Sequence, residues 1–196
     1  MKRAFDIACS FILMLLSSPL LLLLAMAVAC DSRGGVFYGQ IRVGRNDTTF
    51  KMWKFRTMHP QSEAKGQLTV GARDPRITRV GYYLRKFKVD ELPQLWNVFV
   101  GEMSIVGPRP EVPKYVELYN VEQRRVLTIR PGITDEASLR YFEENRLLAE
   151  SSDPEKTYIE EIMPAKLKLN LEYLEHASLG SDLLIIGRTI LRMIRG

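Results

Sequence analysis

The chain of 196 residues is long enough for one globular domain with an attached segment and too short for two independent hydrophobic cores. Its hydrophobic fraction of 46% excludes wholesale disorder. The net charge of +5 is concentrated in residues 31–110, which hold 14 Lys and Arg against 7 Asp and Glu. Such a basic zone suits anionic lipid headgroups, a phosphate-bearing substrate or nucleic acid, and a plain solvated basic face is the alternative.

The first predicted element is an apolar helix over residues 8–30, whose 23 uncharged residues suffice to cross a hydrocarbon core of about 30 Å. Cys9 and Cys30, the only cysteines in the chain, offer neither a disulfide framework nor metal-ligand spacing, which indicates a reducing compartment. Ser18-Pro19 at the centre predicts a sharp kink, because proline removes a helical hydrogen bond. Serine hydroxyls can bind the carbonyl groups that such a kink releases.

The flanks of this helix bear on how it meets a membrane. Lys2 and Arg3 precede it and six Lys or Arg follow it by position 56, so the positive-inside rule places both ends in the cytoplasm. A re-entrant helix anchored by these flanks and broken at Ser18-Pro19 satisfies that rule; a simple span and a cleaved secretory signal are the alternatives. We therefore predict a re-entrant membrane helix over 1–30 and a cytosolic membrane-surface domain over 31–196.

The remaining segments predict a mixed α/β, helix-rich domain. The first expected elements are a β-hairpin over 36–57 that turns at 44–47, helices over 77–87 and 92–100, and a strand over 103–106. From residue 111 onward we expect helices, with breaks at 131–132 and 151–154. The last of these is a charged helical run over 155–177 that Pro164 bends or ends. The last run, 183–194, carries Arg188 and Arg192 along one side, followed by Arg195. This pattern is typical either of a core helix with snorkelling arginines or of an amphipathic helix in a membrane surface.

The densest group of charged side chains lies at residues 85–91, where Arg85, Lys86 and Lys88 precede the adjacent Asp90 and Glu91. Asp90 in front of a helix is a good N-cap, and this purely structural role is the first interpretation. The same residues also suit a phosphate site, since cations and helix-start amides attract a pyrophosphate and carboxylates hold Mg²⁺. A carboxylate can moreover attack phosphorus to give an acyl phosphate.

A second candidate is the turn Gly-Pro-Arg-Pro at residues 107–110. Pro108 and Pro110 restrict the backbone on both sides of Arg109, which holds its guanidinium in a defined position for an anionic group. A rigid turn without any binding role is the alternative.

A series of short motifs resembles the bacterial sugar transferase family, the small monotopic phosphoglycosyl transferases that begin glycoconjugate assembly. The matching residues are, in order, Lys54–Met58, Asp74–Thr78, Gly81, Leu84–Lys86, Asp90–Leu95, Asn97–Val98, Gly101–Ser104, Val106–Pro110, Arg130–Thr134, Ser178–Leu179 and Asp182. The chain departs from the usual family pattern after Thr134, where it has Asp135–Ser138 and a longer helical insertion to about residue 165. The resemblance therefore does not extend to a preference for a particular sugar.

The resemblance implies an enzyme that moves a sugar-1-phosphate from a UDP-sugar to a polyprenyl (undecaprenyl) phosphate and releases UMP. It implies a monotopic protein on the cytoplasmic face of the bacterial inner membrane, with a small cytosolic catalytic domain. Asp90 would be the nucleophile that forms a covalent phosphoglycosyl-aspartate, Glu91 would assist as a base, and the two would hold Mg²⁺. The residues expected to bind or orient substrate are Arg85, Pro108, Arg109, Pro110, Arg56 and Asp182.

Two non-enzymatic functions compete with this interpretation. A membrane-anchored scaffold that binds anionic lipid would need neither the acid pair nor the Pro-Arg-Pro turn, and both are present. A nucleic-acid-binding protein would need aromatic stacking positions among its cations, and Trp53 with Phe55 is a thin set, so we expect no nucleic acid partner. The expected partners are a UDP-sugar, a polyprenyl phosphate and the bilayer surface, and homo-oligomerisation is left open.

Overall fold

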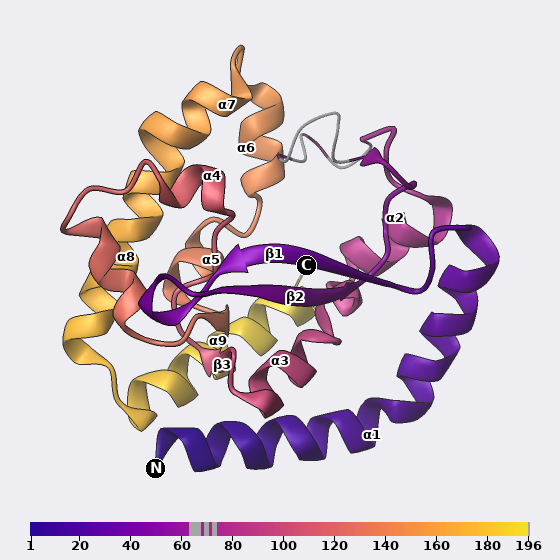
Figure 1. The fold of residues 1–196 in the computed structure, drawn as a ribbon, viewed down its shortest axis with the longest axis horizontal. Helices are drawn as coiled ribbons and strands as arrows, with labels where there is room; N and C mark the ends of the chain where they lie inside the picture. Colours follow the sequence, from indigo (N-terminus) through magenta and orange to yellow (C-terminus); the bar gives the residue numbers. More distant parts are fainter. Residues whose placement is uncertain (63–67, 69–70, 72–73, 196) are drawn as a thin grey trace.

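The computed structural model describes residues 1–62, 68, 71 and 74–195. The helices are α1 (Lys2–Asp31), α2 (Arg79–Lys86), α3 (Gln94–Val100), α4 (Pro113–Val116), α5 (Glu136–Arg140), α6 (Glu144–Glu150), α7 (Pro154–Thr157), α8 (Met163–His176) and α9 (Leu179–Arg195). The strands are β1 (Phe37–Val43), β2 (Thr49–Phe55), β3 (Ser104–Val106) and β4 (Gly132–Thr134), and the shorter turns are the 3₁₀ segments η1 (Arg45–Asp47), η3 (Val89–Glu91) and η4 (Gln123–Thr128) and the π-helical η5 (Tyr158–Ile162). Figure 1 shows these elements as a helix-rich α/β arrangement, which confirms the predicted class.

The strands form two small sheets. β1 and β2 are an antiparallel hairpin, whose turn places Asn46 and Asp47 at positive φ, a conformation that Asn and Asp tolerate. β3 pairs in parallel with β4. The hairpin predicted over 36–57 and the strand predicted over 103–106 are confirmed, whereas β4 lies where the sequence suggested only a break at 131–132.

α1 is the one helix in the described part of the chain that is long and apolar enough to cross a membrane. Pro19 lies within it, and Figure 1 shows the helix bending midway, so that one arm runs beneath the domain and the other rises beside α2. The Ser18 hydroxyl donates a 2.8 Å hydrogen bond to the Leu15 carbonyl, the group that Pro19 leaves without its helical donor. The predicted use of a serine to satisfy a carbonyl released by the proline is confirmed.

The N-terminal end of α1 is held against the domain by polar contacts. Arg3 donates to two carbonyl groups near the C-terminal end of α3, at 2.5 and 2.7 Å, where the helix dipole favours a cation. The buried Asp6 carboxylate accepts hydrogen bonds from the Ser104 hydroxyl at 2.9 Å and the Ile105 amide at 3.1 Å. These contacts tie the start of the apolar helix to both α3 and β3.

A second set of contacts links the same end of α1 to the C-terminal helices. Lys2 forms an ion pair with the buried Asp182 of α9 and donates to the Val106 carbonyl at 3.0 Å. The Tyr173 hydroxyl of α8 donates to the Asp182 carboxylate at 2.5 Å. Asp182 therefore joins α1, α8 and α9 in one polar junction.

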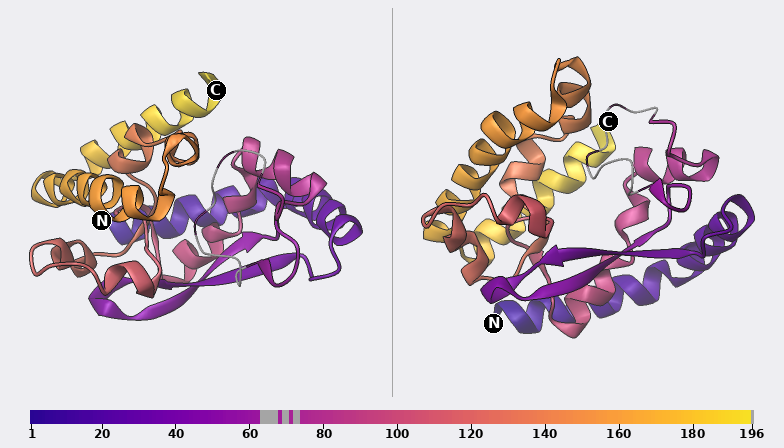
Figure 2. Two further views of the ribbon diagram at one scale, coloured as in Figure 1. Left: turned by 90° about the horizontal axis from the view of Figure 1, so that it is seen from above. Right: turned by 45° about the horizontal axis from the view of Figure 1, so that its top comes forward.

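The C-terminal end of α1 contacts the domain as well. Val28 packs in a buried cluster with Phe55 and Leu84. The Asp31 carboxylate accepts a 2.8 Å hydrogen bond from the Val80 amide in the first turn of α2. Both ends of α1 thus lie against the same domain, and Figure 2 shows the helix following its edge in two further views.

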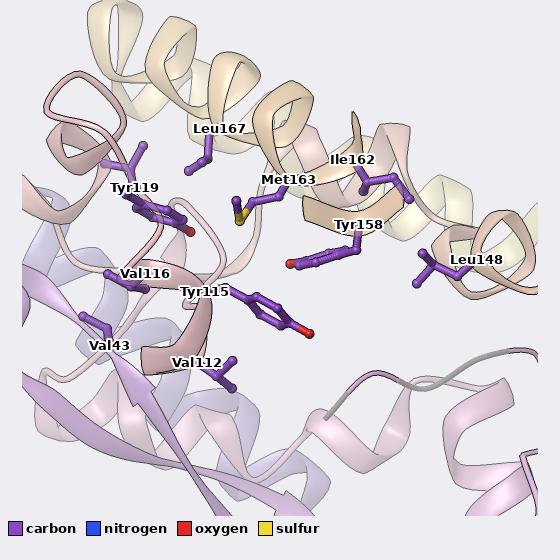
Figure 3. Packing of buried hydrophobic residues seen from close by; sticks show 11 residues of the cluster. Val43, Val112, Tyr115, Val116, Tyr119, Leu148, Tyr158, Ile162, Met163 and Leu167 are labelled. Carbon is purple, nitrogen blue, oxygen red and sulfur yellow. The ribbon is translucent and has the colours of Figure 1, made fainter. Parts of the chain in front are cut away.

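The largest cluster of buried hydrophobic side chains lies between β1, α4 and the helices that follow residue 140 (Figure 3). Its members are Val43, Val112, Tyr115, Val116, Tyr119, Val126, Leu148, Tyr158, Ile162, Met163 and Leu167. The rings of Tyr115 and Tyr158 meet with their centroids 4.9 Å apart, which joins α4 to η5. Tyrosines let one wall of this core border a polar cavity, because each has an apolar ring and a polar tip.

The long predicted run over 155–177 is a succession of α7, η5 and α8. Pro164 lies in the first turn of α8, where a helix needs no backbone donor, so the helix continues past it to His176 rather than ending there. The π-helical turn η5 directly precedes this proline. Of the two predicted effects of Pro164, an end of the helix is therefore wrong, whereas a bend stays a prediction.

α9 is amphipathic and largely uncovered. Its buried residues include Asp182 and Ile185, whereas the exposed apolar side chains are Leu183, Leu184, Ile190, Leu191, Met193 and Ile194. Of the two interpretations of this segment, the buried core helix is therefore wrong, because so much of its apolar surface faces outward.

Candidate active site

The acid pair lies in the short turn between α2 and α3. Asp90 and Glu91 belong to the 3₁₀ segment η3, which follows Lys88 in a left-handed conformation with φ of 57°. The residue that precedes α3 is Pro93, and neither η3 nor α3 receives a side-chain capping bond. Asp90 is thus not an N-cap: the first, purely structural interpretation of this residue is wrong, because a 3₁₀ turn and a proline separate it from the helix.

Glu91 is the anchor of a charged cluster. Its carboxylate accepts a 2.9 Å hydrogen bond from Lys54 and is paired with Arg109 through both oxygens. Burial alone would raise the pKa of Glu91, but the Arg109 and Lys54 cations hold this pKa well below its ordinary value. Glu91 is therefore ionised throughout the neutral range and fixes two cations beside the turn.

Asp90, the residue directly before Glu91, has the opposite environment. It is 6% exposed, and its carboxylate accepts no hydrogen bond from the residues that the structure describes. Burial raises the pKa of Asp90 above its ordinary value, and the nearby Lys54 cation opposes this rise without cancelling it. Two neighbouring carboxylates with pKa values pushed apart are typical of sites that use one for chemistry and the other for charge.

Asn97 holds the acid pair next to β2. Its side-chain oxygen accepts a 3.0 Å hydrogen bond from the Trp53 amide, and its side-chain nitrogen donates to the Lys51 carbonyl at 2.8 Å and to Glu102 at 2.6 Å. The side chain is fully buried and fully paired, so α3 has a fixed position against the strand. This brings Lys54, the residue after Trp53, to Glu91.

The Pro-Arg-Pro turn is fixed by a close approach of two backbone segments. A side chain at Gly132 would lie 2.1 Å from the Gly107 nitrogen, so this crossing requires glycine. The Gly132 amide donates to the Pro108 carbonyl at 3.0 Å, and the Arg109 amide donates to the buried Asp135 carboxylate at 3.1 Å. The turn therefore holds Arg109 firmly against Glu91.

The predicted binding residues largely converge on one cavity of about 500 Å³, a size typical of small-molecule sites. Arg85, Asp90, Glu91, Pro108, Arg109 and Pro110 all line it. Burial lowers the pKa of Arg85 and of Lys54, yet a guanidinium keeps its charge, so the side of the cavity around Asp90 is cationic. Such a surface suits a phosphate or pyrophosphate.

Two predicted binding residues do not line this cavity. Arg56 donates to the Gly35 and Phe37 carbonyls at 3.0 and 3.2 Å, beside the start of β1. Asp182 lies in the junction with Lys2, described above. The structure thus gives both side chains contacts that hold secondary-structure elements together.

Several residues of the site were missed from the sequence. Lys54 lies in a recognised motif but was not singled out, because its approach to Glu91 depends on β2 packing against α3. Asp135 also was not named as a site residue, although its position after Gly132–Thr134 was visible. Tyr115, Ser138 and Asn170 line the cavity from segments that carry no local signal of a binding role.

The acid pair offers a partial set of ligands for Mg²⁺. Among the described residues, no group of three or more His, Cys, Asp or Glu side chains forms a ready metal cage. Mg²⁺ is commonly held by one or two carboxylates and completes its shell with phosphate oxygens and water. Asp90 fits this use, because its carboxylate accepts no hydrogen bond from the described residues, whereas both oxygens of Glu91 are already engaged by Arg109 and Lys54.

Comparison with known proteins agrees with this site. The family model described as bacterial sugar transferase matches residues 1–196. The chain is 36% identical over 204 residues to the undecaprenyl-phosphate glucose phosphotransferase of Komagataeibacter xylinus, covering 98% of this chain and 36% of that protein. It is 35% identical over 200 residues to the UDP-N-acetylgalactosamine-undecaprenyl-phosphate N-acetylgalactosaminephosphotransferase of Aeromonas hydrophila, covering 100% of this chain and 44% of that protein.

A third relative matches over most of its own length. The chain is 36% identical over 204 residues to the exopolysaccharide production protein ExoY of Rhizobium meliloti (strain 1021), covering 96% of this chain and 83% of that protein. The chain therefore spans less than half of the first two relatives and most of the third. The chain belongs to the bacterial sugar transferase family, as its motifs predicted.

Proposed function

We propose that this protein transfers a sugar-1-phosphate from a UDP-sugar to undecaprenyl phosphate and releases UMP, as the first membrane step of glycoconjugate assembly. The observation that carries the proposal is the cavity in which Asp90, buried and with a raised pKa, stands among the cations Lys54, Arg85 and Arg109. The names of the Komagataeibacter and Aeromonas relatives specify the same acceptor, undecaprenyl phosphate.

The first step is an attack by Asp90. A carboxylate oxygen forms a bond to the sugar-linked phosphorus of the UDP-sugar, the bond from that phosphorus to the bridging oxygen breaks, and UMP leaves with that oxygen. A raised pKa makes the carboxylate a stronger nucleophile, and Arg85 and Arg109 offset the negative charge that gathers at the phosphates. In the second step an oxygen of the lipid phosphate attacks the same phosphorus, the acyl phosphate bond breaks, and the Asp90 carboxylate is restored.

Glu91 acts in this scheme by positioning cations. Its pKa lies well below the ordinary value, so it is a weak proton acceptor at neutral pH. The lipid phosphate is ionised at that pH and needs no base to become a nucleophile. The contacts of Glu91 with Lys54 and Arg109 support an orienting role in place of the base implied by the family resemblance.

Mg²⁺ is the cofactor of this proposal. When bound, it would neutralise the pyrophosphate and improve UMP as a leaving group. Asp90 would hold it together with phosphate oxygens of the donor. Removal of divalent cations with EDTA is expected to stop UMP release, and restoration by added Mg²⁺ is the control.

We further propose that α1 is re-entrant and that the domain over 31–196 lies on the cytoplasmic face of the bacterial inner membrane. Support comes from the two ends of α1, which contact the same domain through Arg3 and Asp31. A straight helix of this length would measure about 45 Å and carry its ends to opposite faces of a bilayer. The apolar side chains of α1 and α9 would then lie in the lipid and at its interface, respectively.

Cysteine labelling tests this topology in a variant with Cys9 and Cys30 replaced by alanine. One cysteine is inserted after Met1 and another replaces the exposed Arg33, since neither position holds a docking contact. In intact cells both are expected to resist a membrane-impermeant maleimide, and in inverted membrane vesicles both are expected to react. Labelling of either position from outside would contradict the re-entrant helix, and Pro19→Leu is expected to shift one end to the outer face.

The catalytic proposal is tested with the purified protein in lipid nanodiscs, undecaprenyl phosphate, Mg²⁺ and a panel of UDP-sugars. UMP release and a lipid-linked sugar phosphate are expected to appear together with at least one sugar. With no lipid acceptor, a burst of UMP equal to the amount of enzyme is expected, accompanied by a mass increase on the peptide that carries Asp90. Binding to anionic vesicles without turnover of any UDP-sugar would instead favour the non-enzymatic scaffold.

A further inference from the structure

Two polar atoms in the wall of the cavity have no hydrogen-bond partner among the described residues. They are the side-chain oxygen of Asn170 in α8 and the hydroxyl oxygen of Ser138 in α5. Asn170 is 4% exposed, and α5 packs against α8. A buried amide or hydroxyl without a partner destabilises a fold, so packing alone does not account for this pair.

The charges near these two groups are neutralised within the protein. Lys166 of α8 donates to Glu144 of α6 at 2.7 Å, so neither charge of this pair is left for a ligand. Thr134 and Thr189 are hydrogen-bonded to each other at 2.7 Å. The wall formed by α5 and α8 therefore offers neutral polar groups to the cavity.

The cavity lining around Asp90 has a different character. It is cationic: Lys54 of β2 and Arg85 of α2 lie close enough to act on the Asp90 carboxylate, and Arg109 lies in the turn at 107–110, next to the start of α5. Figure 1 shows α2 and α8 on opposite sides of the molecule. A cavity with one cationic wall and one neutral, hydrogen-bonding wall matches a ligand whose anionic part carries an uncharged, hydroxylated group.

We propose that Asn170 and Ser138 form the subsite that recognises the sugar ring of the donor, an inference that rests on the proposed function. The Asn170 amide offers an acceptor and a donor to ring hydroxyls or to an acylamino group, and the Ser138 hydroxyl offers either. A sugar with one substituent misplaced leaves both the protein group and its own hydroxyl unpaired, which is how a polar site rejects a close analogue. Ser138 belongs to the segment after Thr134 in which this chain departs from the usual family pattern, and Asn170 lies on α8, shortly after that segment.

The test uses Asn170→Leu and Ser138→Ala. For each variant, kcat/KM is measured with UDP-glucose, UDP-galactose and their N-acetylamino counterparts. The wild-type preference for its best sugar over that sugar's epimer is expected to fall about tenfold or more in Asn170→Leu and less in Ser138→Ala. Glu172→Gln, an exposed change on the same helix, is expected to keep the wild-type preference.

Two further measurements separate recognition from structural damage. The affinity for UMP, which lacks the sugar, is expected to be unchanged in Asn170→Leu, while the affinity for the UDP-sugar falls. The unfolding temperature without substrate is expected to equal or exceed that of the wild type, because leucine removes an unpaired buried amide.

The outcomes are distinct. Folded variants with an unchanged preference would overturn the subsite, and so would a parallel loss of UMP affinity, which would assign these residues to the nucleotide. A wild-type protein that makes no lipid-linked product with any UDP-sugar would defeat the proposed function itself. If Asn170→Leu fails to fold, Ser138→Ala decides the question on the same criteria.

Discussion

Two clusters of charged residues lie near the two ends of α3, and they differ in how completely their groups are paired. At the C-terminal end, the docking cluster of Lys2, Arg3 and Asp6 is saturated: each charge meets a carboxylate, a carbonyl, a hydroxyl or an amide. At the N-terminal end, Glu91 is saturated as well, but Asp90 accepts no hydrogen bond from the described residues.

This difference separates stability from chemistry. A charge whose partners are all supplied by the protein contributes to holding elements together, and adding a substrate would only break those bonds. A buried charge without partners is costly for the fold and is therefore expected where a ligand completes it. The docking cluster and Glu91 belong to the first kind, and Asp90 to the second.

The largest expected effect is that of Asp90→Asn on turnover. If Asp90 is the nucleophile, the amide is expected to lower kcat on the order of 10⁴-fold or more and to abolish the UMP burst. Mass spectrometry of the enzyme after incubation with the UDP-sugar and Mg²⁺ checks the loss of the covalent adduct. Near-normal turnover would exclude the proposed mechanism.

The same substitution is expected to leave stability intact. A pKa raised in the folded state means that the protonated form of Asp90 stabilises the fold, and this contribution is lost as the pH rises through the folded-state pKa. Asn resembles the protonated acid at every pH. The unfolding temperature of Asp90→Asn at pH 7.5 is therefore expected to equal or exceed that of the wild type, and the difference is expected to vanish below the ordinary pKa of 3.8.

Glu91→Gln is expected to behave in the opposite way. Removal of this charge leaves Lys54 and Arg109 buried without their anion, which costs about 3 kcal/mol of unfolding free energy near pH 7. Because the folded-state pKa of Glu91 is depressed, the stabilisation is present above its ordinary pKa of 4.5 and is lost as the pH falls through the folded value. Chemical unfolding in detergent at pH 7 and pH 4 measures this, with the exposed Glu175→Gln as the control. A deficit that does not shrink on acidification would contradict the ion-pair account.

Asp6→Ala is expected to weaken the fold with little effect on the chemistry. It leaves the Ser104 hydroxyl and the Ile105 amide without their acceptor, at a cost of about 2 kcal/mol. Turnover well below the unfolding temperature is expected to stay within about threefold of the wild type, since the cavity is not lined by Asp6. Parallel assays of thermal unfolding and UMP release check both statements. A loss of turnover comparable to that of Asp90→Asn would show that the docking cluster is part of the reaction.

Local pattern predicted much of this molecule. Runs rich in β-forming residues around a turn predicted the hairpin of β1 and β2. Pro93 predicted the start of α3, and Ser18-Pro19 predicted the kink satisfied by a serine. The acid pair and the Pro-Arg-Pro turn could be recognised because each is a short, chemically unusual run. Their meeting in one cavity follows from the close crossing at Gly107 and Gly132, which no local pattern describes.

Contacts between distant segments account for what could not be predicted. Lys2 and Asp182 are 180 positions apart in the chain, so nothing near either residue indicates that they pair. Lys2 and Arg3 were interpreted as residues that keep the N-terminal flank in the cytoplasm, because positive charges beside apolar helices usually have that effect. Asp90 resembled an N-cap because an acid before a helix usually is one, and only the position of Pro93 shows otherwise.

The smallest expected effect concerns Arg3 and tests whether its role is its charge or its shape. Arg3→Lys keeps the positive flank, so a purely topological role predicts no change in insertion or stability. The guanidinium, however, donates to two carbonyl groups at the end of α3, and an ammonium cannot reproduce that forked geometry. We therefore expect a loss of about 1 kcal/mol, measured by thermal unfolding in detergent, with membrane insertion unchanged. Arg33→Lys on the exposed flank after α1 is the matched control, because it alters the same residue type without a docking contact. Equal stability of the two variants would show that only the positive charge of Arg3 matters. The contacts of Lys2 and Asp6 would then account for the attachment of the start of α1.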